Sequence, residues 1–450
     1  MGAIEIMEQF LQKLDHGLDQ CSRRADFNGI GVAFSGGLDS TLLLAALARS
    51  EGRSRVRALH INHGLHPESE SWVEHCSQTA AKFGIAFNSR SIDITKIAGQ
   101  SLEAVARQAR YAMLAELMEP GELLLTAHHR DDQLETVLLR LLRGSGVKGL
   151  RGISPNMPFG PGYLARPMLE ISKDEIRNCA SLWGLNWIED SSNRDQCFDR
   201  NYLRSEVIPQ LQQRWPGVAI TAGRAARQMA AAQELLDFAA ITDSSKVESP
   251  ARVSQAYLRE LSQSRRGNLL RYLIGGLGLS VPNAAQLNQL ISAIDVTRPD
   301  AQTQVQWPGG EGRIFRGQLY LFEPLTTASA PGYEGRLEIS KPWQGPEGRL
   351  ELSQADGVGL SEAWVAKGFT VRFRTGGERF KPLDSAHSRK LKKWLQLAGI
   401  VPWMRQRIPL LYCDSMLVAV GDLWLSDEAC KAGTNGPSWQ VTWTDHPSID

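Results

Sequence analysis

The hexapeptide Ser-Gly-Gly-Leu-Asp-Ser at residues 35–40 has the residue types of a phosphate-binding turn. It follows an apolar run, residues 30–34, with the composition of a strand, and precedes an Ala/Leu-rich segment, residues 41–47, with the composition of a helix. Glycines let the backbone approach a ligand closely, and the free N–H groups at a helix N-terminus suit phosphate. The hexapeptide is neither a Walker A loop nor a G-x-G-x-x-G fingerprint. An ordinary serine-glycine helix cap is the simpler alternative.

A pair of carboxylates, Asp132 and Glu135, forms a second candidate set. The two residues are three apart, so they share one face of the helix predicted to begin here. Two carboxylates near a triphosphate are suited to holding Mg²⁺ or to receiving an ammonium group. The alternative is that they only complement the positive end of a helix. His128 and His129 would bind one metal ion poorly, because adjacent side chains point apart.

Alternating strands and helices must position these residues. The pattern predicts further strands over residues 55–62, 85–92 and 123–127, and helices over 69–83 and 101–118. Such alternation with short connections is typical of an α/β fold with a doubly wound parallel sheet, in which ligands bind beyond the carboxyl ends of the strands. We therefore expect residues 35–40, 60–63 and 126–132 to converge on one crevice.

The segment after the second candidate set is rich in glycine and in cations. Residues 141–152 contain four glycines and three cations, Lys148 among them. This composition suits a mobile loop that closes over anions, and a plain surface loop is the alternative.

Charge is distributed unevenly along the chain. The formal net charge is only +1, but residues 367–407 hold eleven Lys and Arg against two acids. Within this segment, Leu391, Trp394 and Leu395 share one helix face, so the cations can face outward. A basic module of this kind suits a phosphate backbone, and a solvated basic face is the alternative.

Length and cysteine content limit the class of protein. The 450 residues suffice for about three domains. The six cysteines are scattered with no C-x-x-C pair, which argues against a disulfide framework or a cysteine zinc site and fits a reduced cytosol. The N-terminus has no signal-peptide pattern, and no stretch approaches the ~20 apolar residues of a membrane span. We expect a cytoplasmic protein without a membrane partner.

The ordered motifs resemble one family. Ser-Gly-Gly-x-Asp-Ser alone resembles the PP-loop of the ATP pyrophosphatases, which split ATP between its α and β phosphates. Together with Thr-Ala-His-His-Arg-Asp-Asp-Gln-Leu-Glu-Thr at 126–136 and the loop at 141–150, it resembles tRNA(Ile)-lysidine synthase. Further similar motifs are Arg-Pro-Met-Leu at 166–169, Glu-Asp-Ser-Ser-Asn at 189–193, Arg-Asn-Tyr-Leu-Arg at 200–204, Arg-x-Gly-Gly-Glu-Arg-x-x-Pro at 374–382 and Arg-Lys-Leu-Lys-Lys at 389–393.

The resemblance implies an ATP-dependent ligase that attaches free L-lysine to C2 of the wobble cytidine, position 34, in the isoleucine tRNA with a CAU anticodon. ATP would adenylate O2 of the base and release pyrophosphate, with Mg²⁺ as cofactor. The lysine ε-amine would then attack C2 and expel AMP.

The resemblance also implies roles for individual residues. Those expected to bind ATP are Ser35, Gly36, Gly37, Leu38, Asp39 and Ser40, and those expected to contact tRNA are Lys148, Arg204, Arg374, Arg379, Arg389, Lys390, Lys392 and Lys393. Asp39 would act near Mg²⁺. Arg110 would brace the base or the adenylate, unless it is a solvated helix cation. Asp132 and Glu135 would hold the lysine amine or accept its proton.

The chain departs from the family at one position. Where many members have an arginine, this chain has His66. If the position contacts phosphate, that contact is weaker here and depends on pH.

Four segments follow from these patterns: a PP-loop catalytic domain over 1–217, a mostly helical tRNA-facing domain over 218–323, a linker over 324–345, and a small basic α+β domain over 346–450. A tRNA sulfur-transferase of the same superfamily is a rival function, disfavoured because the cysteines are unpaired. A non-catalytic tRNA-binding protein is another, disfavoured by the intact loop and carboxylates. The sequence leaves open whether the chain forms a homodimer.

Overall fold

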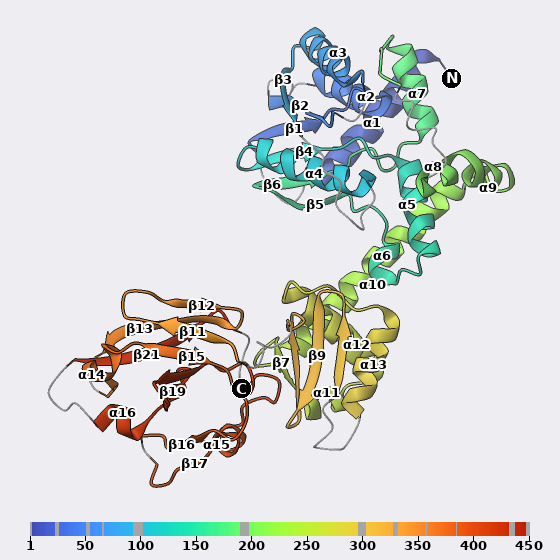
Figure 1. Ribbon diagram of the computed structural model, residues 1–450. Coiled ribbons are helices and arrows are strands. Elements are labelled where there is room, and N and C mark those ends of the chain that lie inside the picture. The colour runs from blue at the N-terminus through green and yellow to red at the C-terminus, as the bar shows by residue number, and fades with distance from the viewer. Residues whose placement is uncertain are drawn as a thin grey trace. The chain divides into compact units, whose positions relative to one another are not determined.

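The computed structural model describes residues 2–22, 27–50, 55–64, 67–92, 102–189, 198–295, 303–326, 332–355, 358–383, 385–431 and 437–446. The chain folds into two compact units, Met1–Leu236 and Asp237–Asp450 (Figure 1). Helix α10 (Val218–Ser244) continues from one unit into the other. Within the described ranges, none of the helices has the length and apolar character needed to cross a membrane.

A six-stranded sheet forms the centre of the N-terminal unit, in the order β3-β2-β1-β4-β6-β5. Its strands are β1 (Gly29–Ala33), β2 (Val56–Asn62), β3 (Ala86–Ser91), β4 (Glu122–Leu125), β5 (Asn156–Phe159) and β6 (Gly162–Ala165). Neighbouring strands are parallel except for the antiparallel β5–β6 hairpin. The predicted α/β fold with a doubly wound parallel sheet is confirmed, and the hairpin is an addition that the sequence did not predict.

Helices cover both faces of this sheet because side chains alternate along each strand. Leu123 and Leu125 of β4 belong to a core that includes residues of α1, α2, α3 and α7, whereas Leu124 packs with residues of α4 on the opposite face. These helices are α1 (Ala3–Ser22), α2 (Leu38–Ala48), α3 (Ser69–Lys82), α4 (Leu102–Leu117) and α7 (Lys173–Leu182).

The strand order reverses between β1 and β4. The chain proceeds from β1 outward to β2 and β3, and from β4 outward on the other side to β6. Helix α5 (Arg130–Leu142) follows β4 and packs against η3 (Leu203–Val207), a π-helical turn, and the helices α9 (Ile208–Arg214) and α10. Ligands of doubly wound sheets bind at such a reversal, beyond the carboxyl ends of the strands.

The first part of the C-terminal unit, residues 237–326, places helices against an antiparallel sheet of order β7-β10-β9-β8. The strands are β7 (Arg252–Ser254), β8 (Gln304–Trp307), β9 (Gly310–Phe315) and β10 (Gln318–Phe322). The helices are α11 (Gln255–Glu260), α12 (Gln263–Gly276) and α13 (Ala284–Asp295), and their apolar faces share one core with the sheet.

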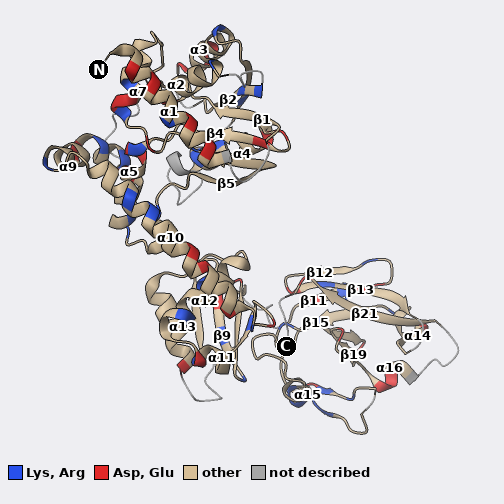
Figure 2. Ribbon diagram, turned by 180° about the vertical axis from the view of Figure 1, so that it is seen from behind, with Lys and Arg blue, Asp and Glu red and all other residues tan. Residues whose placement is uncertain are grey.

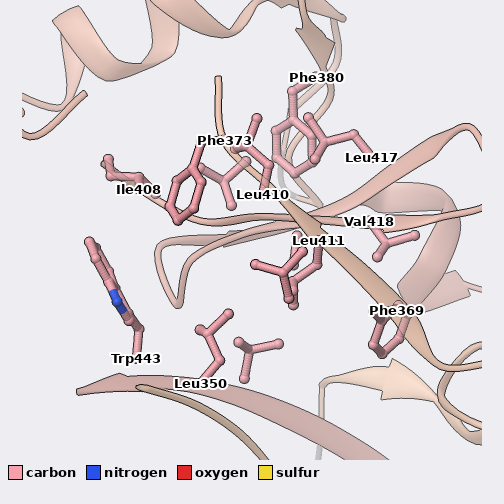
Figure 3. Packing of buried hydrophobic residues seen from close by; sticks show 14 of the residues in the cluster. Leu350, Phe369, Phe373, Phe380, Ile408, Leu410, Leu411, Leu417, Val418 and Trp443 are labelled. Carbon is pink, nitrogen blue, oxygen red and sulfur yellow. The ribbon is translucent and has the colours of Figure 1, made fainter. Parts of the chain in front are cut away.

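The second part, residues 332–446, contains two antiparallel sheets, β11-β15-β18-β19-β20 and β12-β13-β21-β14. Their strands are β11 (Glu334–Leu337), β12 (Trp343–Gly345), β13 (Gly348–Ala355), β14 (Leu360–Ser361), β15 (Phe369–Arg372), β18 (Leu410–Cys413), β19 (Met416–Val420), β20 (Trp424–Leu425) and β21 (Ser438–Thr444). Leu350 and Trp443 from one sheet face Leu411 from the other across a shared core (Figure 3).

Shorter elements complete this part of the chain. They are the hairpin of β16 (Arg379–Phe380) and β17 (Arg389–Lys390) and the helices α14 (Glu362–Val365), α15 (Leu391–Leu397) and α16 (Asp427–Lys431). The mixed α+β character predicted here is confirmed.

The predicted linker, residues 324–345, differs from the structure. It contains β11 and β12, which pair with β15 and β13. The pairing partners lie later in the chain, so the local Thr, Ala, Ser, Pro and Gly composition conceals these strands. The other boundaries stay a prediction: α10 begins at the expected limit after residue 217, while the compact units divide within α10.

Candidate functional site

The loop at residues 35–40 is closed by its own hydroxyl groups. The Ser35 and Ser40 hydroxyls lie 3.0 Å apart, and Ser40 Oγ donates to the Gly37 carbonyl over 3.1 Å. Gly36 has φ +78°, and a Cβ at this position would lie 2.7 Å from Cys76 Sγ. Gly37 is the N-cap of α2 without a side-chain cap, so the first N–H groups of this helix are available to a ligand.

Asp39, in the first turn of α2, forms an ion pair with Lys173, the first residue of α7. Lys173 Nζ lies 2.6 Å from Asp39 Oδ1 and 2.8 Å from Oδ2. Both side chains remain about one-third exposed, so the pair can exchange with solvent or with another ion. Lys173 is a residue of this site that the sequence patterns did not indicate.

His129 connects this ion pair to helix α5. Its ring caps α5 by accepting the Asp131 N–H over 3.3 Å, and its Nε2 lies 3.9 Å from Asp39 Oδ2. Asp131 in turn accepts the Lys173 N–H over 2.9 Å. The loop at 35–40 and residues 126–132 therefore converge, as predicted, and the beginning of α7 joins them.

The His129 ring carries an altered pKa. Burial lowers the pKa of this imidazole, but the surrounding carboxylates outweigh burial, so the pKa is raised above 6.5. These carboxylates belong to Asp131, Asp132 and Asp39. His128 differs: its Nδ1 pairs with the Thr126 hydroxyl over 2.8 Å, and burial lowers its pKa to about 3.

Asp132 and Glu135 face the same pair of arginines, which agrees with their predicted position on one helix face. Glu135 is almost fully buried, with Arg200 Nε at 2.8 Å and Arg204 Nε at 2.7 Å from its two oxygens. Asp132 Oδ1 lies farther away, 3.9 Å from Arg200 and 3.7 Å from Arg204. The charge of Glu135 is thus balanced by two arginines of the same chain. Arg204, which we expected to contact tRNA, instead forms an ion pair with Glu135.

The pKa of Asp132 lies below its ordinary value. Burial raises this pKa, but it is outweighed by interactions with the His129 ring, then with His128 and the His129 backbone N–H, and then with Arg200. Asp132 is therefore a carboxylate at neutral pH.

Arg110 of α4 lies near the end of β2. Its guanidinium is 5.7 Å from the Tyr111 ring, and its charge adds to burial in lowering the pKa of His63 to about 4. Arg110 therefore lies close to His63 at the end of β2, and the convergence predicted for residues 60–63 stays a prediction. The positions of His66 and of residues 190–193 fall outside the described residues.

The glycine-rich segment after α5 is partly helical. It contains α6 (Val147–Leu150), and Arg140 donates to the carbonyls of Gly149 and Gly152 over 2.6 and 2.7 Å. Lys148 is exposed on α6. The predicted loop is thus a turn held by an arginine, with Lys148 and Arg151 exposed at its surface.

The basic motifs of the C-terminal unit serve two purposes. Arg374 is mostly buried, 3.4 Å from Glu378, inside a turn where Gly376 and Gly377 have positive φ, so its charge is used internally. Arg379 donates to the Ser388 carbonyl across the β16–β17 hairpin over 3.1 Å.

The remaining cations lie on β17 and α15 (Figure 2). Leu391 and Leu395 are buried and Trp394 half-buried, as predicted. The exposed residues are Arg389, Lys390, Lys392 and Lys393, and they form no ion pair with the other residues that the structure describes.

The site suits a metal ion that is held mainly by the phosphates of a bound nucleotide. Within the described ranges, no three His, Cys, Asp or Glu side chains are grouped to hold a metal. Mg²⁺ commonly binds through one or two carboxylates together with substrate phosphates, and Asp39 supplies such a carboxylate.

The fold and the Ser35–Ser40 turn define an ATP-binding protein of the PP-loop class. Residues 7–211 match the family described as PP-loop domain, 254–320 the TilS substrate binding domain, and 369–443 the TilS substrate C-terminal domain. A tRNA(Ile)-lysidine synthase of Coxiella burnetii is 38% identical over 86% of this chain and 87% of the relative, and one of Alkalilimnicola ehrlichii is 38% identical over 93% and 94%. The chain belongs to the tRNA(Ile)-lysidine synthase family.

Solved structures show a more distant likeness. A U34-tRNA thiolase from Methanococcus maripaludis is 17% identical with a TM-score of 0.40, covering 49% of this chain and 80% of that chain.

We expect Glu135→Gln to lower the free energy of unfolding of the N-terminal unit by about 1–3 kcal/mol, because two arginines lose a buried carboxylate. The cost falls below that of a fully buried pair because Arg200 and Arg204 are partly exposed. Urea unfolding measures the change. Glu170→Gln, which breaks the exposed pair with Arg227, is the control and should change stability by less than about 0.5 kcal/mol. Equal effects of the two variants would contradict an internal role for Glu135.

We expect His129 to titrate above pH 6.5 in the folded chain. Because the folded pKa is raised, the associated stability is present below pH 6.5 and is lost as the pH rises through the folded pKa. Asp39→Asn should lower this pKa, since one of the carboxylates that raise it is removed. Histidine NMR titration measures both values, with the exposed Asp174→Asn as control. A His129 pKa below 6.5, or one unmoved by Asp39→Asn, would disprove the coupling.

Proposed function

We propose that this chain ligates lysine to the wobble cytidine of the CAU-anticodon isoleucine tRNA, forming lysidine with release of AMP and pyrophosphate. The observation that carries the proposal is the position of the His129 ring at the start of α5. Its Nε2 lies 3.9 Å from Asp39 of the Ser35–Ser40 loop and 3.5 Å from the Asp132 carboxylate. It brings a phosphate-binding turn beside groups that can receive an amine. The proposal is also supported by the names of relatives that align over most of the chain.

The first step in the proposed reaction needs ATP to be held for attack at the α-phosphate. The glycine turn and the open N-terminus of α2 supply N–H groups for the phosphates. Asp39 would hold Mg²⁺, which stabilises charge on the phosphates when it is bound. Lys173, released from Asp39, would then contact the same phosphates. Transfer then depends on orientation and charge stabilisation more than on covalent help from the protein.

The second step needs a carboxylate that binds the lysine ammonium. Asp132 suits this role better than Glu135, because both Glu135 oxygens already accept short bonds from Arg200 and Arg204. The lowered pKa of Asp132 favours holding the ammonium over removing its proton. Glu135 would position the two arginines, and Arg110 would brace the base or the adenylate.

The tRNA would be gripped by the exposed cations of β17 and α15, with Lys148 of α6 near the reacting end. Such contacts neutralise phosphates without reading sequence. Arg374 and Arg204 would act indirectly, because each is paired with a glutamate.

Purified protein, ATP, Mg²⁺ and unmodified isoleucine tRNA should incorporate labelled lysine into the tRNA. Absence of any one component should abolish incorporation. Sulfur incorporation without lysine uptake would favour the rival sulfur-transferase. Binding of tRNA with no turnover of ATP would favour a non-catalytic tRNA-binding protein.

We expect Asp39→Asn to reduce tRNA-dependent pyrophosphate release at least ~100-fold, because a carboxylate that balances phosphate charge is removed. The tRNA dissociation constant should change less than about threefold, since Asp39 lies at the proposed nucleotide site. Pyrophosphate release and filter binding measure the two quantities. Asp174→Asn, one residue after Lys173 and exposed, is the matched control. Normal turnover of Asp39→Asn would refute the role of Asp39.

We expect neutralising Arg389, Lys390, Lys392 and Lys393 together to flatten the salt dependence of tRNA binding. A plot of the logarithm of the tRNA association constant against the logarithm of salt concentration has a negative slope. Its magnitude should decrease by roughly 0.7–0.9 for each phosphate that these cations no longer neutralise. Arg336→Gln with Arg349→Gln is the control, because these arginines are already paired with Glu338 and Glu351. A slope that does not differ between the two sets would show that β17 and α15 are not the grip.

A further inference from the structure

A groove of about 550 Å³ lies in the C-terminal unit, between the β16–β17 hairpin and β20. Leu383 and Leu425 contribute apolar surface, Trp394 and Trp424 contribute indole rings, and His387 and Arg389 contribute polar groups. This volume is within the range of small-ligand sites and can accommodate a nucleobase with its sugar.

Backbone pairing fixes the walls of the groove. The Leu383 N–H donates to the Leu425 carbonyl over 3.0 Å, and Pro382 forms an antiparallel bridge with Ser426. Lys381 Nζ lies 2.7 Å from Asp427 Oδ2. The hairpin and β20 are therefore joined through both backbone and side chains, so the groove exists before a ligand binds.

The two indoles of the groove differ in their partners. Trp394 Nε1 donates to the Phe380 carbonyl over 3.0 Å, and the Arg389 guanidinium lies 5.3 Å from the Trp394 ring. Trp424 is half-buried, and no aromatic or cationic group among the described residues contacts its ring. Trp424 therefore presents an indole surface that a flat ligand can stack on.

A permanent positive charge lies at the groove. Among the described residues that line it, Arg389 carries this charge and none is a carboxylate, and Arg389 is followed by the exposed Lys390, Lys392 and Lys393. A ligand that stacks on Trp424 and also carries phosphate would satisfy both the ring and the cations. Unpaired nucleotides have this combination, whereas the bases of a duplex are already stacked on one another.

We propose that this groove binds an unpaired nucleotide of the tRNA, with its base stacked on Trp424 and its phosphates near Arg389 and α15. The identity of the RNA as tRNA rests on the proposed function. The exposed cations of β17 and α15 would bind phosphates of any RNA, and the groove would in addition distinguish single-stranded from paired RNA.

Fluorescence anisotropy with the full-length chain tests the proposal, using a labelled single-stranded RNA of about eight nucleotides and a duplex of the same sequence. Trp424→Leu should weaken binding of the single strand by about 5- to 100-fold, because one base–indole stack is removed. Binding of the duplex should change less than about twofold, since phosphate contacts remain. Trp424→Phe should restore most of the single-strand affinity.

Trp364→Leu is the matched control, because Trp364 also packs half-buried against the core of the same part of the chain. It should leave both affinities unchanged. Equal reductions for single strand and duplex, or no reduction with Trp424→Leu, would overturn the proposal. Thermal melting of each variant checks folding.

A photocrosslink tests the wild-type chain without any substitution. Single-stranded RNA containing 5-iodouridine should crosslink to Trp424, His387 or Trp394, and crosslinks confined to other surfaces would overturn the groove assignment. Lysine incorporation is measured on the same preparation. Absence of lysine incorporation with an intact preference for single-stranded RNA would refute the proposed function alone. Normal lysine incorporation without that preference would refute the groove proposal alone.

Discussion

The ion pair between Asp39 and Lys173 is the interaction on which the arrangement of the site depends. It joins the first turn of α2 to the start of α7 across 134 positions of sequence, and Asp131 and His129 tie both to α5. Partial exposure means that the pair adds little to stability, on the order of 0–1 kcal/mol. Its value is geometric, because the lysine holds the Asp39 carboxylate beside the Ser35–Ser40 loop. In the proposed reaction, Lys173 would yield this carboxylate to Mg²⁺.

Burial divides the acidic residues of α5 between structure and chemistry. Glu135 lies one turn below the helix start and is enclosed by Arg200 and Arg204, which the π-helical segment η3 and the preceding α8 (Asp199–Tyr202) bring to it. Asp132, nearer the helix start, keeps a longer separation from the same arginines. Glu135 would therefore hold the two arginines in place, and Arg200 would help to keep the pKa of Asp132 low. The lysine amine would then meet a carboxylate that is already ionised.

Local sequence was sufficient for the parts of this site that depend on local periodicity. Apolar runs predicted the strands, and the spacing of Asp132 and Glu135 predicted their common face. Lys173 could not be found in this way, because Ser-Lys-Asp-Glu indicates only a capped helix start and its partner lies far away in sequence. The same holds for Arg200, and for β11 and β12, whose strand character comes from pairing. Arg204 and Arg374 were expected at the RNA surface because a guanidinium alone does not reveal its buried glutamate.

The order of bond cleavage tests the two-step account most directly. With ATP labelled on the α-phosphate, isoleucine tRNA and Mg²⁺ but no lysine, the account predicts one equivalent of pyrophosphate per active site and label retained on the tRNA. Adding lysine should then release labelled AMP. Formation of ADP and phosphate, or pyrophosphate release that requires lysine but not tRNA, would contradict activation of the base at the Ser35–Ser40 loop.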